Sequence, residues 1–281
     1  MNRLYAPFFA VALAALSTVA AADGIQVPRV LQRSSMLDSA AAFWKKTKPV
    51  LVAMLPQVVT TPAKPDASTQ QLRVRAAHDG QWIAFLIEWE DSTKDDRIGL
   101  DRFGDQVAVE LPLANKDGVL PSPMMGHAGA PVDIWQWRAV LQRDLDDGET
   151  QITDLYPNAQ IDLYPDQVLR ATDARPYMGA LGLDNPVSHP LRSPVLDQVA
   201  EGWGSLTVEP DGQDAEGRGT WQAGRWRVVI AHPLASGHPE SDIALKAGDR
   251  SNVAFAVWNG GNQEVGSRKA WSNWIPLRLA K

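Results

Sequence analysis

Two adjacent methionines are the side chains in this sequence with the clearest potential for chemistry. Met124 and Met125 lie in a loop rich in proline and glycine, Pro-Ser-Pro-Met-Met-Gly-His, which begins at Pro121. A thioether on a rigid loop can ligate a soft metal centre, and haem iron accepts Met sulfur, His nitrogen or, rarely, a neutral Lys amine. Methionine is also a common filler of hydrophobic cores, and packing is the default interpretation of such a pair.

A lysine near the C-terminal end is the second candidate ligand. Lys269 lies in the polar loop Gly-Ser-Arg-Lys-Ala, which begins at Gly266. A lysine amine can bind a metal only after it loses its proton, and its ordinary pKa is about 10.4. Burial and the metal itself must therefore favour the neutral form. The default interpretation of a single lysine in a polar loop is a solvated surface residue.

Other kinds of site find little support. The chain has no cysteine, which excludes covalent c-type haem attachment, Cys-ligated iron–sulfur clusters and thiolate zinc sites. It contains no Gly-x-Ser-x-Gly elbow and no dinucleotide fingerprint. No pair of carboxylates is marked out for glycoside hydrolysis. The five histidines are scattered without the spacing of a metal motif: His78, His127, His189, His232 and His238.

The first residues resemble an export signal. Arg3 is followed by an apolar run over residues 8–16 and by small residues up to Ala22. The run is too short to span a bilayer, so we expect a signal peptide at residues 1–22, cleaved near Ala22, and a single domain at residues 23–281. The net charge of −6 and the absence of a basic stripe argue against a nucleic-acid-binding protein.

The elements that must position these loops are predicted to be strands. Residues 72–77 and 82–89 flank Asp79-Gly80, a strong hairpin signal, and residues 219–222 and 225–231 flank Ala223-Gly224. In the strand at residues 82–89, alternation predicts that Ile83, Phe85, Ile87 and Trp89 face the core. Further strands are predicted at residues 49–59, 106–111, 133–141, 203–208, 253–258 and 274–279.

The remaining segments complete the expected fold. A short helix is predicted at residues 38–46, with Phe43 and Trp44 facing inward. Residues 143–199 are polar and rich in turns, which predicts a long loop insertion. Many short strands with turn signals between them favour an all-β fold, an antiparallel two-sheet β-sandwich with a few short helices.

The tryptophan content leaves one alternative function open. The chain has eleven tryptophans, compared with four tyrosines and six phenylalanines. Trp residues fill the cores of many β-sandwiches, and they also bind sugars in secreted carbohydrate-binding modules. The residues alone therefore predict an exported β-sandwich whose function is open.

Several segments, taken in order, resemble a known family. They include Pro-Met-Met-Gly-His, then Pro-Val-Asp-Ile-Trp-Gln-Trp-Arg-Ala, Asp-Gln-Val-Ala-Val-Glu-Leu-Pro from Asp105, Val-Ala-Phe-Ala-Val-Trp-Asn-Gly from Val253, and Gly-Ser-Arg-Lys from Gly266. This set is similar to the haem-binding γ subunit of the ethylbenzene dehydrogenase, dimethylsulfide dehydrogenase, chlorate reductase and selenate reductase group. The resemblance extends over about residues 72–279.

The resemblance implies one non-covalent b-type haem with Met and Lys as axial ligands. These positions correspond to Met125 and Lys269, with Met124 as the alternative sulfur ligand. His127 and Arg268 are candidate partners of the haem propionates, with an exposed position as the alternative for each. Trp135 and Trp137 are candidates for packing against the macrocycle, with core packing expected for at least one of them. Ser267 and Ala270 replace the Gly and Ser of the family pattern, which leaves the lysine in place.

The resemblance also implies a role. Such a subunit is periplasmic and does no substrate chemistry of its own. It relays electrons between the iron–sulfur subunit of a molybdenum oxidoreductase and a soluble c-type cytochrome or similar carrier. A secreted carbohydrate- or ligand-binding module is the alternative expectation.

Overall fold

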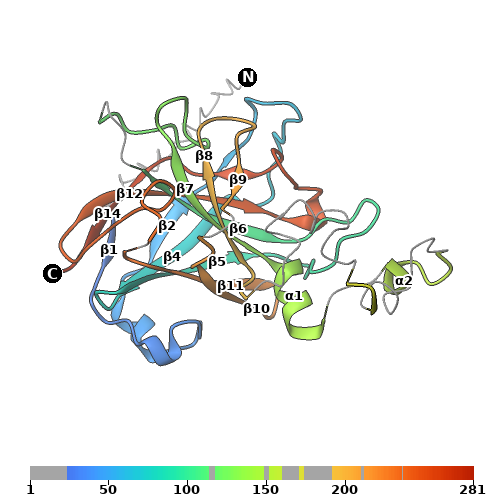
Figure 1. Cartoon of the computed structure of the whole chain (residues 1–281), viewed down its shortest axis with the longest axis horizontal. Helices are drawn as coiled ribbons and strands as arrows, with labels where there is room; N and C mark the ends of the chain where they lie inside the picture. The colour runs from blue at the N-terminus through green and yellow to red at the C-terminus, as the bar shows by residue number, and fades with distance from the viewer. Residues whose placement is uncertain are drawn as a thin grey trace, which may run out of the picture.

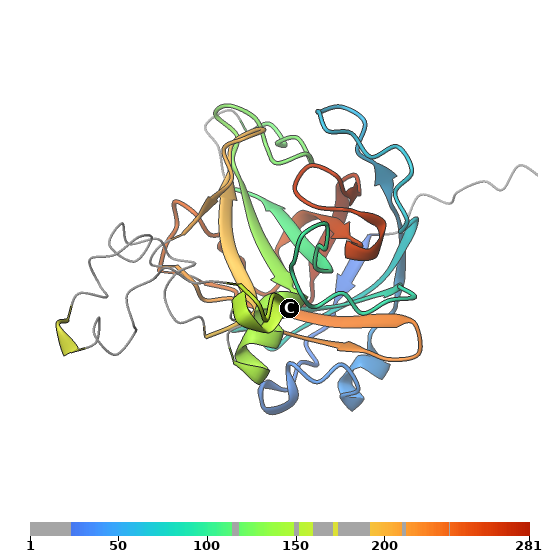
Figure 2. The same cartoon turned by 90° about the vertical axis from the view of Figure 1, so that its right-hand side faces the viewer.

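The strands form two sheets that lie one over the other (Figures 1 and 2). The computed structural model describes residues 24–113, 118–148, 152–159, 171–173, 192–209, 212–235 and 237–281. The all-β sandwich predicted from the sequence is confirmed. The predicted signal peptide and most of the predicted insertion lie outside the described residues. In the described part of the chain, no helix is long and apolar enough to cross a membrane.

The larger sheet carries the strands that matter most for the site. Its strand order is β1 (Ile25–Val27), β14 (Ile275–Leu279), β12 (Arg250–Trp258), β6 (Gln106–Pro112), β7 (Val132–Arg138), β8 (Val195–Ala200) and β9 (Thr207–Val208). A short strand, β13 (Ala270–Trp271), pairs with β12 and with β3 (Leu55–Pro56). Strands β1 and β14 are parallel, and the other pairs are antiparallel.

The smaller sheet contains both predicted hairpins. Its order is β10 (Glu216–Trp221), β11 (Arg225–Pro233), β5 (Trp82–Glu90), β4 (Gln71–His78) and β2 (Val50–Ala53). At the β4–β5 turn, the Asp79 side chain accepts hydrogen bonds from the backbone N–H groups of Gln81 and Trp82, and Gly80 has a positive φ of 98°. These local turn preferences explain why both hairpins are readable from sequence.

The core lies between the sheets. The predicted inward face of β5 is confirmed, since Ile83, Phe85, Ile87 and Trp89 are all buried in the main cluster. The other face of β5 is also covered. There, Phe43 and Trp44 of the 3-10 helix η2 (Ala42–Lys46) pack against that face. The short helix predicted at residues 38–46 is therefore confirmed in part, because it begins at residue 42, after another short turn, η1 (Arg33–Ser35).

Several predictions about individual elements are wrong. The strand predicted at residues 133–141 ends at Arg138, and the chain continues as helix α1 (Ala139–Asp147), which is rich in good helix formers. Strand β8 lies inside the segment expected to be a loop insertion. The strand predicted at residues 203–208 is reduced to β9, because Gly202 and Gly204 adopt positive φ and form a turn.

The remaining helical segments are short. They are α2 (Ile152–Leu155) and the 3-10 turn η5 (Gly260–Asn262), which follows β12. The strand predicted at residues 49–59 is divided into β2 and β3, which belong to different sheets. In this way the chain passes from the smaller sheet to the larger one and reaches the side of the molecule where the loops gather.

Candidate functional site

A pocket of about 570 Å³ lies on the outer face of the larger sheet. Its floor consists of alternate residues of four neighbouring strands, since successive side chains of a strand point to opposite faces. Val107, Trp135, Phe255 and their inward-facing neighbours enter the core, and the residues between them face the pocket. The floor residues are Gln106, Ala108, Glu110, Ile134, Gln136, Gln198, Ala256 and Trp258.

Four loops form the walls of this pocket. In Figure 2 the blue loop after β3, the green loop before β7 and the red loop before β13 gather around one region, together with the turn between β8 and β9. They contribute Gln57, Thr60 and Thr61, then Met124 and Met125, then Trp203, Gly204 and Leu206, and finally residues 265–267 with Lys269. Loops that are far apart along the chain therefore meet in one place.

Lys269 is held in the wall by its backbone. It immediately precedes β13, and its carbonyl oxygen accepts a hydrogen bond of 3.2 Å from the backbone N–H of Gln57. The Gln57 side chain donates to the Ser267 carbonyl at 3.0 Å, and the Trp258 indole donates to the Gly266 carbonyl at 2.9 Å. These bonds fix the loop on both sides of the lysine.

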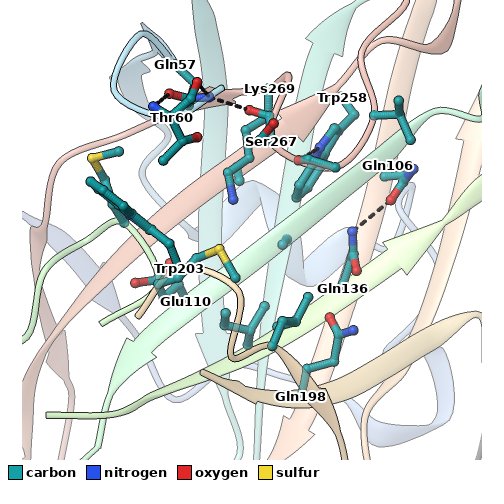
Figure 3. Close-up of a pocket in the computed structure, with 18 of the residues that line it drawn as sticks. Gln57, Thr60, Gln106, Glu110, Gln136, Gln198, Trp203, Trp258, Ser267 and Lys269 are labelled. Atoms are coloured by element: carbon teal, nitrogen blue, oxygen red, sulfur yellow. Dashed lines mark hydrogen bonds between the residues drawn. The ribbon is translucent and has the colours of Figure 1, made fainter. Parts of the chain in front are cut away.

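The Lys269 amine extends into the pocket (Figure 3). It lies 5.1 Å from the centroid of the Trp258 ring and forms no ion pair with a described carboxylate. Burial lowers the pKa of this amine, although the nearby Glu110 opposes that shift. The neutral amine, which is the form that can donate a lone pair to a metal, is therefore favoured here more than on a protein surface.

Glu110 is a buried acid on the pocket floor that the sequence did not mark out. Burial raises its pKa to about 7, while the charge of Lys269 and the backbone N–H of Met125 act in the opposite direction. Its Oε1 atom has no hydrogen-bond partner. In strand β6, apolar residues that face the core alternate with residues of the other face. A charged residue on that other face was therefore expected to be exposed to solvent.

The methionine loop places its two sulfur-bearing residues differently. Met125 has a positive φ of 70°, which is rare for a residue with a side chain, and its carbonyl accepts a hydrogen bond of 2.7 Å from the Gly202 N–H. Its partly buried side chain packs against the apolar cluster that contains Ala108, Ile134 and Trp258. Met124 lines the pocket but does not belong to this cluster. The loop therefore directs Met125 onto the pocket floor.

The two candidate partners of the propionates, His127 and Arg268, lie outside the pocket. His127 is exposed, and its Nδ1 atom accepts a hydrogen bond from the Ser122 N–H within the loop. The Arg268 guanidinium lies 5.4 Å from the centroid of the Phe103 ring. Neither residue lines the pocket.

Trp135 requires a correction. Its side chain is fully buried between the sheets, where it stacks on His232 with the ring centroids 4.4 Å apart. It therefore cannot pack against a group in the pocket, which lies on the other face of β7. Its neighbours Ile134 and Gln136 face the pocket instead. The alternation of side chains along the strand predicts this difference, because neighbouring residues point to opposite faces of the sheet.

A polar strip crosses one end of the pocket floor. The Gln136 amide donates to the Gln106 side chain at 2.7 Å, and the Arg138 guanidinium donates to Gln136 at 2.8 Å. Burial lowers the pKa of Arg138. This strip gives one end of the floor side chains that can receive hydrogen-bonding or anionic groups.

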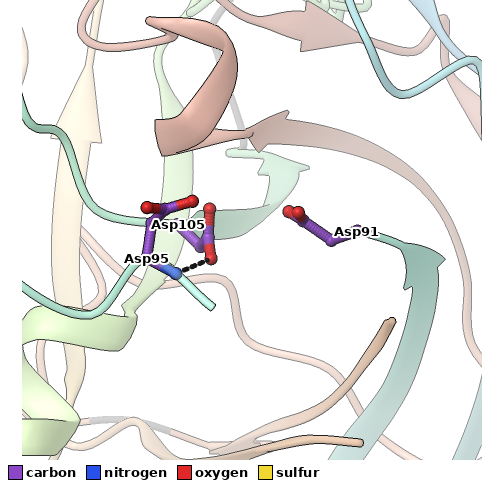
Figure 4. Close-up of side chains that lie close together, drawn as sticks. All are labelled: Asp91, Asp95 and Asp105. Atoms are coloured by element: carbon purple, nitrogen blue, oxygen red, sulfur yellow. Dashed lines mark hydrogen bonds between the residues drawn. The ribbon is translucent and has the colours of Figure 1, made fainter. Parts of the chain in front are cut away.

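Asp105 holds together the strand ends beneath this floor. Its two oxygens accept hydrogen bonds from the backbone N–H groups of Asp95 and Gly260 and from the indole of Trp226, at 2.8–2.9 Å. The carboxylates of Asp91, Asp95 and Asp105 lie close together (Figure 4), with one oxygen of each within 4.8 Å of the others. Burial, and then the charge of Asp91, raise the pKa of Asp105 to about 7. The N–H donors around Asp105 identify it as a structural residue.

Comparison with known proteins gives two relatives that match most of this chain. A protein of Haloferax mediterranei named for a respiratory nitrate reductase heme subunit, ORF7, is 26% identical over 261 residues, which cover 92% of this chain and 74% of that protein. Chlorate reductase subunit gamma of Ideonella dechloratans is 27% identical over 291 residues, which cover 99% of this chain and 98% of the relative.

A solved structure is less similar. A protein of Bacteroides uniformis described as carbohydrate-binding has a TM-score of 0.45 and 7% identity, with 92% of this chain and 99% of that chain covered. A likeness of this size supports no functional argument. In contrast, the family described as ethylbenzene dehydrogenase matches residues 41–270, which include every loop and strand that lines the pocket. The chain belongs to the ethylbenzene dehydrogenase family.

Proposed function

We propose that this chain is a γ-type electron-transfer subunit of an oxidoreductase complex and that its pocket holds one non-covalent b-type haem. The observation that carries this proposal is the position of Lys269. Its amine extends into the pocket, has no ion-pair partner among the described residues, and has a lowered pKa. Burial disfavours the charged form of this lysine, and the nearby Glu110 offsets that effect only in part, so a ligand for the neutral amine would account for its position.

The residues of the pocket fit a haem in three respects. Met125 offers a soft thioether from the loop wall, and Lys269 offers an amine from the wall formed by the β13 loop. Ala108, Ile134 and Ala256 provide an apolar floor for a flat macrocycle. The strip of Gln106, Gln136 and Arg138 would receive the charged propionate groups. The pocket volume also lies within the usual range for small-molecule and cofactor sites.

The backbone strain at Met125 supports Met125, in preference to Met124, as the sulfur ligand of the haem iron. A left-handed backbone at a residue with a side chain costs about 1–3 kcal/mol and persists only where surrounding contacts enforce it. Here the Gly202 N–H bond and the packing against Trp258 enforce it. We infer that this conformation aims the Met125 sulfur at the iron and that Met124 lines the rim.

The role of the protein residues is to hold and tune the cofactor. A haem supplies a one-electron redox centre, whose potential depends on its axial ligands, burial and hydrogen bonds. Met125 and Lys269 would bind the haem iron. A charged Glu110 favours the protonated Lys269 amine, so a protonated Glu110 would accompany the neutral amine that binds iron. The chain would do no substrate chemistry itself.

The spectrum of the full-length protein expressed with haem available tests this function. We expect a low-spin b-type spectrum that changes on reduction, and haem that an acidified organic solvent extracts. Met125→Leu should alter the spectrum and lower the reduction potential, because thioether ligation raises the potential. Met124→Leu is the matched control and should leave both properties unchanged.

Lysine variants complete the test. Lys269→Leu should abolish the low-spin spectrum, whereas Lys246→Leu removes an exposed lysine and should have no effect. If only the Met124 variant changes the spectrum, the sulfur ligand must be reassigned. A folded protein that remains colourless when haem is supplied would disprove the haem proposal.

The partners and location form part of the same proposal. The two named relatives belong by name to nitrate and chlorate reductases, which supports a complex with a molybdenum-containing subunit and an iron–sulfur subunit. A c-type cytochrome or similar carrier would exchange electrons with the haem in the periplasm. Purification of a tagged chain from its own cells should recover both subunits. N-terminal sequencing of the periplasmic protein should begin after Ala22. Recovery of the chain alone from the cytoplasm would contradict this part.

The tryptophans do not favour the alternative of a sugar-binding module. Trp44, Trp89, Trp135, Trp137, Trp226 and Trp258 are buried, and most of them fill the core. Trp203 is well exposed, but it lies on the rim of the same pocket.

A further inference from the structure

A basic groove of about 390 Å³ lies on the outer face of the smaller sheet, between strands β4, β5 and β11 and the segment that contains η2. Its basic lining residues are Lys45, Arg73, Arg75, Arg225 and Arg227. Glu88 of β5 is the one acid among the residues that line it. The whole chain has a net charge of −6, so this groove concentrates positive charge on a chain that is acidic overall.

The strand register spreads the four arginines over a wide area. Arg73 of β4 and Arg227 of β11 lie opposite Glu88 on its two sides. Arg75 lies two residues further along β4, and Arg225 lies two residues away in the other direction on β11. Because strands are about 4.8 Å apart and alternate residues about 7 Å apart, the arginines span roughly 10 Å across the strands and roughly 14 Å along them.

The base of the groove is held by hydrogen bonds to the segment that contains η2. Arg75 donates to the carbonyl oxygen of Thr47 at 2.8 Å, and Arg227 donates to the carbonyl oxygen of Ser39. Both arginines are half-buried. Their guanidinium groups are therefore fixed in position before any ligand arrives, which lowers the entropy lost on binding.

The positive charges of the groove are only partly compensated. The Glu88 carboxylate lies 3.7 Å from Arg73 Nε and 3.2 Å from Arg227 Nε, so two guanidinium groups share one acid. Arg75 forms no ion pair with a described carboxylate. Burial lowers the pKa of Arg75, and the two neighbouring arginines lower it further, although Glu88 opposes them. An anion in the groove would relieve this repulsion between cations.

The rim of the groove carries the exposed basic side chains. The side chains of Arg73 and Arg225 are 45% and 47% exposed, and Lys45 is exposed on η2. Arg225 pairs with Glu90, whose side chain is 71% exposed. Such an exposed ion pair contributes little free energy, so the carboxylate of a partner can replace Glu90 at small cost.

The spacing and charge fit an acidic peptide segment better than a single small anion. Carboxylates on one side of an extended chain are about 7 Å apart, which is also the separation of the two arginines on each strand. A guanidinium group binds a carboxylate through two parallel hydrogen bonds, so arginines at this separation can bind several acids at once. One phosphate or sulfate ion would engage only part of the groove.

We propose that this groove binds an extended acidic segment of a partner subunit. The groove and the pocket lie on the outer faces of different sheets, and Figure 1 shows the blue η2 segment on the side away from β7 and β8. The pocket mouth therefore stays open while the segment is bound. That the partner belongs to the same oxidoreductase complex rests on the proposed function, whereas the binding of an acidic segment does not.

Cross-linking of the complex purified from its own cells tests the partner. A carbodiimide joins a lysine amine directly to a carboxylate, and we expect it to join Lys45 to acids within one short segment of a partner subunit. Arg73→Gln combined with Arg225→Gln should weaken binding of the partner roughly tenfold at low salt, and the difference should disappear at high salt. Arg250→Gln combined with Arg278→Gln is the matched control, because it removes two exposed strand arginines of the larger sheet.

A labelled peptide of alternating glutamate and alanine tests the groove without a partner or haem. In fluorescence anisotropy, the peptide should bind the wild-type chain and the Arg250→Gln/Arg278→Gln control, but not the Arg73→Gln/Arg225→Gln variant. No binding to the wild-type chain, equal binding by both double variants, or full displacement by an equal concentration of inorganic phosphate overturns the proposal. A complex that resists salt equally in both double variants overturns the assignment of a partner subunit. The haem spectrum of the same variants should match the wild type, and a chain without haem would contradict the proposed function while the peptide still decides this inference.

Discussion

Asp105 makes the stability of this protein depend on pH in an unusual direction. Its carboxyl group is fully buried, and burial together with the charge of Asp91 raises its pKa from 3.8 to about 7. In the unfolded chain the group releases its proton above about pH 4. In the folded protein it keeps the proton up to about pH 7. The folded state therefore binds more protons across this window, and its stability falls as the pH rises.

The size of this effect follows from the pKa difference. A pKa that moves from 3.8 to about 7 corresponds to about 4 kcal/mol of unfolding free energy, lost between pH 4 and pH 8. Asp105→Asn removes the titration. It also disturbs the bonds to Asp95, Gly260 and Trp226, which costs roughly 1–3 kcal/mol at every pH. The stability advantage of the wild-type protein over this variant should therefore shrink by about 4 kcal/mol across the window.

Urea unfolding followed by tryptophan fluorescence at several pH values measures this difference. The signal is favourable because Trp226 donates directly to the Asp105 carboxylate. Asp147→Asn is the control, since Asp147 is an exposed acid on α1. A difference between wild type and Asp105→Asn that stays constant from pH 4 to pH 8 would refute the reasoning, because it would show that burial does not hold the proton.

Three substitutions test the positioning of the pocket. Gly219→Ala places a Cβ atom 2.4 Å from the ring of Trp137 in the core, so it should lower the free energy of unfolding in urea by roughly 1–3 kcal/mol. Gly237→Ala is the control, because a Cβ atom there meets open space. Equal stabilities of the two variants would contradict this packing. Gly126→Ala combines a positive φ with a backbone oxygen at 2.7 Å and should weaken haem binding in a titration more than Gly129→Ala, which meets only the positive φ. Gln57→Ala removes five hydrogen bonds and should speed hydrogen exchange in the β13 loop; unchanged exchange there would show that Gln57 does not hold it.

The parts of the fold that sequence could predict are those with local signals. Asp79-Gly80 and Ala223-Gly224 specify their hairpins through turn preferences that need no tertiary contacts. Strand β8 carried no such signal. Its central residues, Asp197 and Gln198, are polar, although one is buried between the sheets near His232 and the other faces the pocket. A strand with polar residues on both faces lacks the usual alternation of polar and apolar residues, so its sequence predicts a loop. Such departures from the usual pattern are common at functional sites.

The site was predictable in its loops but not in its floor. Met125 and Lys269 were identified through the family resemblance, and the structure brings both to one pocket, while their role as ligands stays a prediction. Glu110 was missed because its polarity suggested exposure, and burial of an acid cannot be read from alternation alone. Trp135 was a candidate for contact with the macrocycle, but it lies in the core between the sheets, as does Trp137. In a strand, the alternating direction of the side chains decides on which face of the sheet each residue lies.

The parallel pairing of β1 with β14 has a consequence for biosynthesis. Residues Ile25–Val27 pair with residues Leu277–Leu279, so the first strand of the described chain has no partner until the last one has been made. The core cluster includes Ile25 and Leu277 on these strands, and it too is incomplete until then. A chain emerging from the ribosome therefore cannot finish this sheet until residues 275–279 have been made. Shortening it by the last few residues would leave β12 with an open edge and a new route to aggregation.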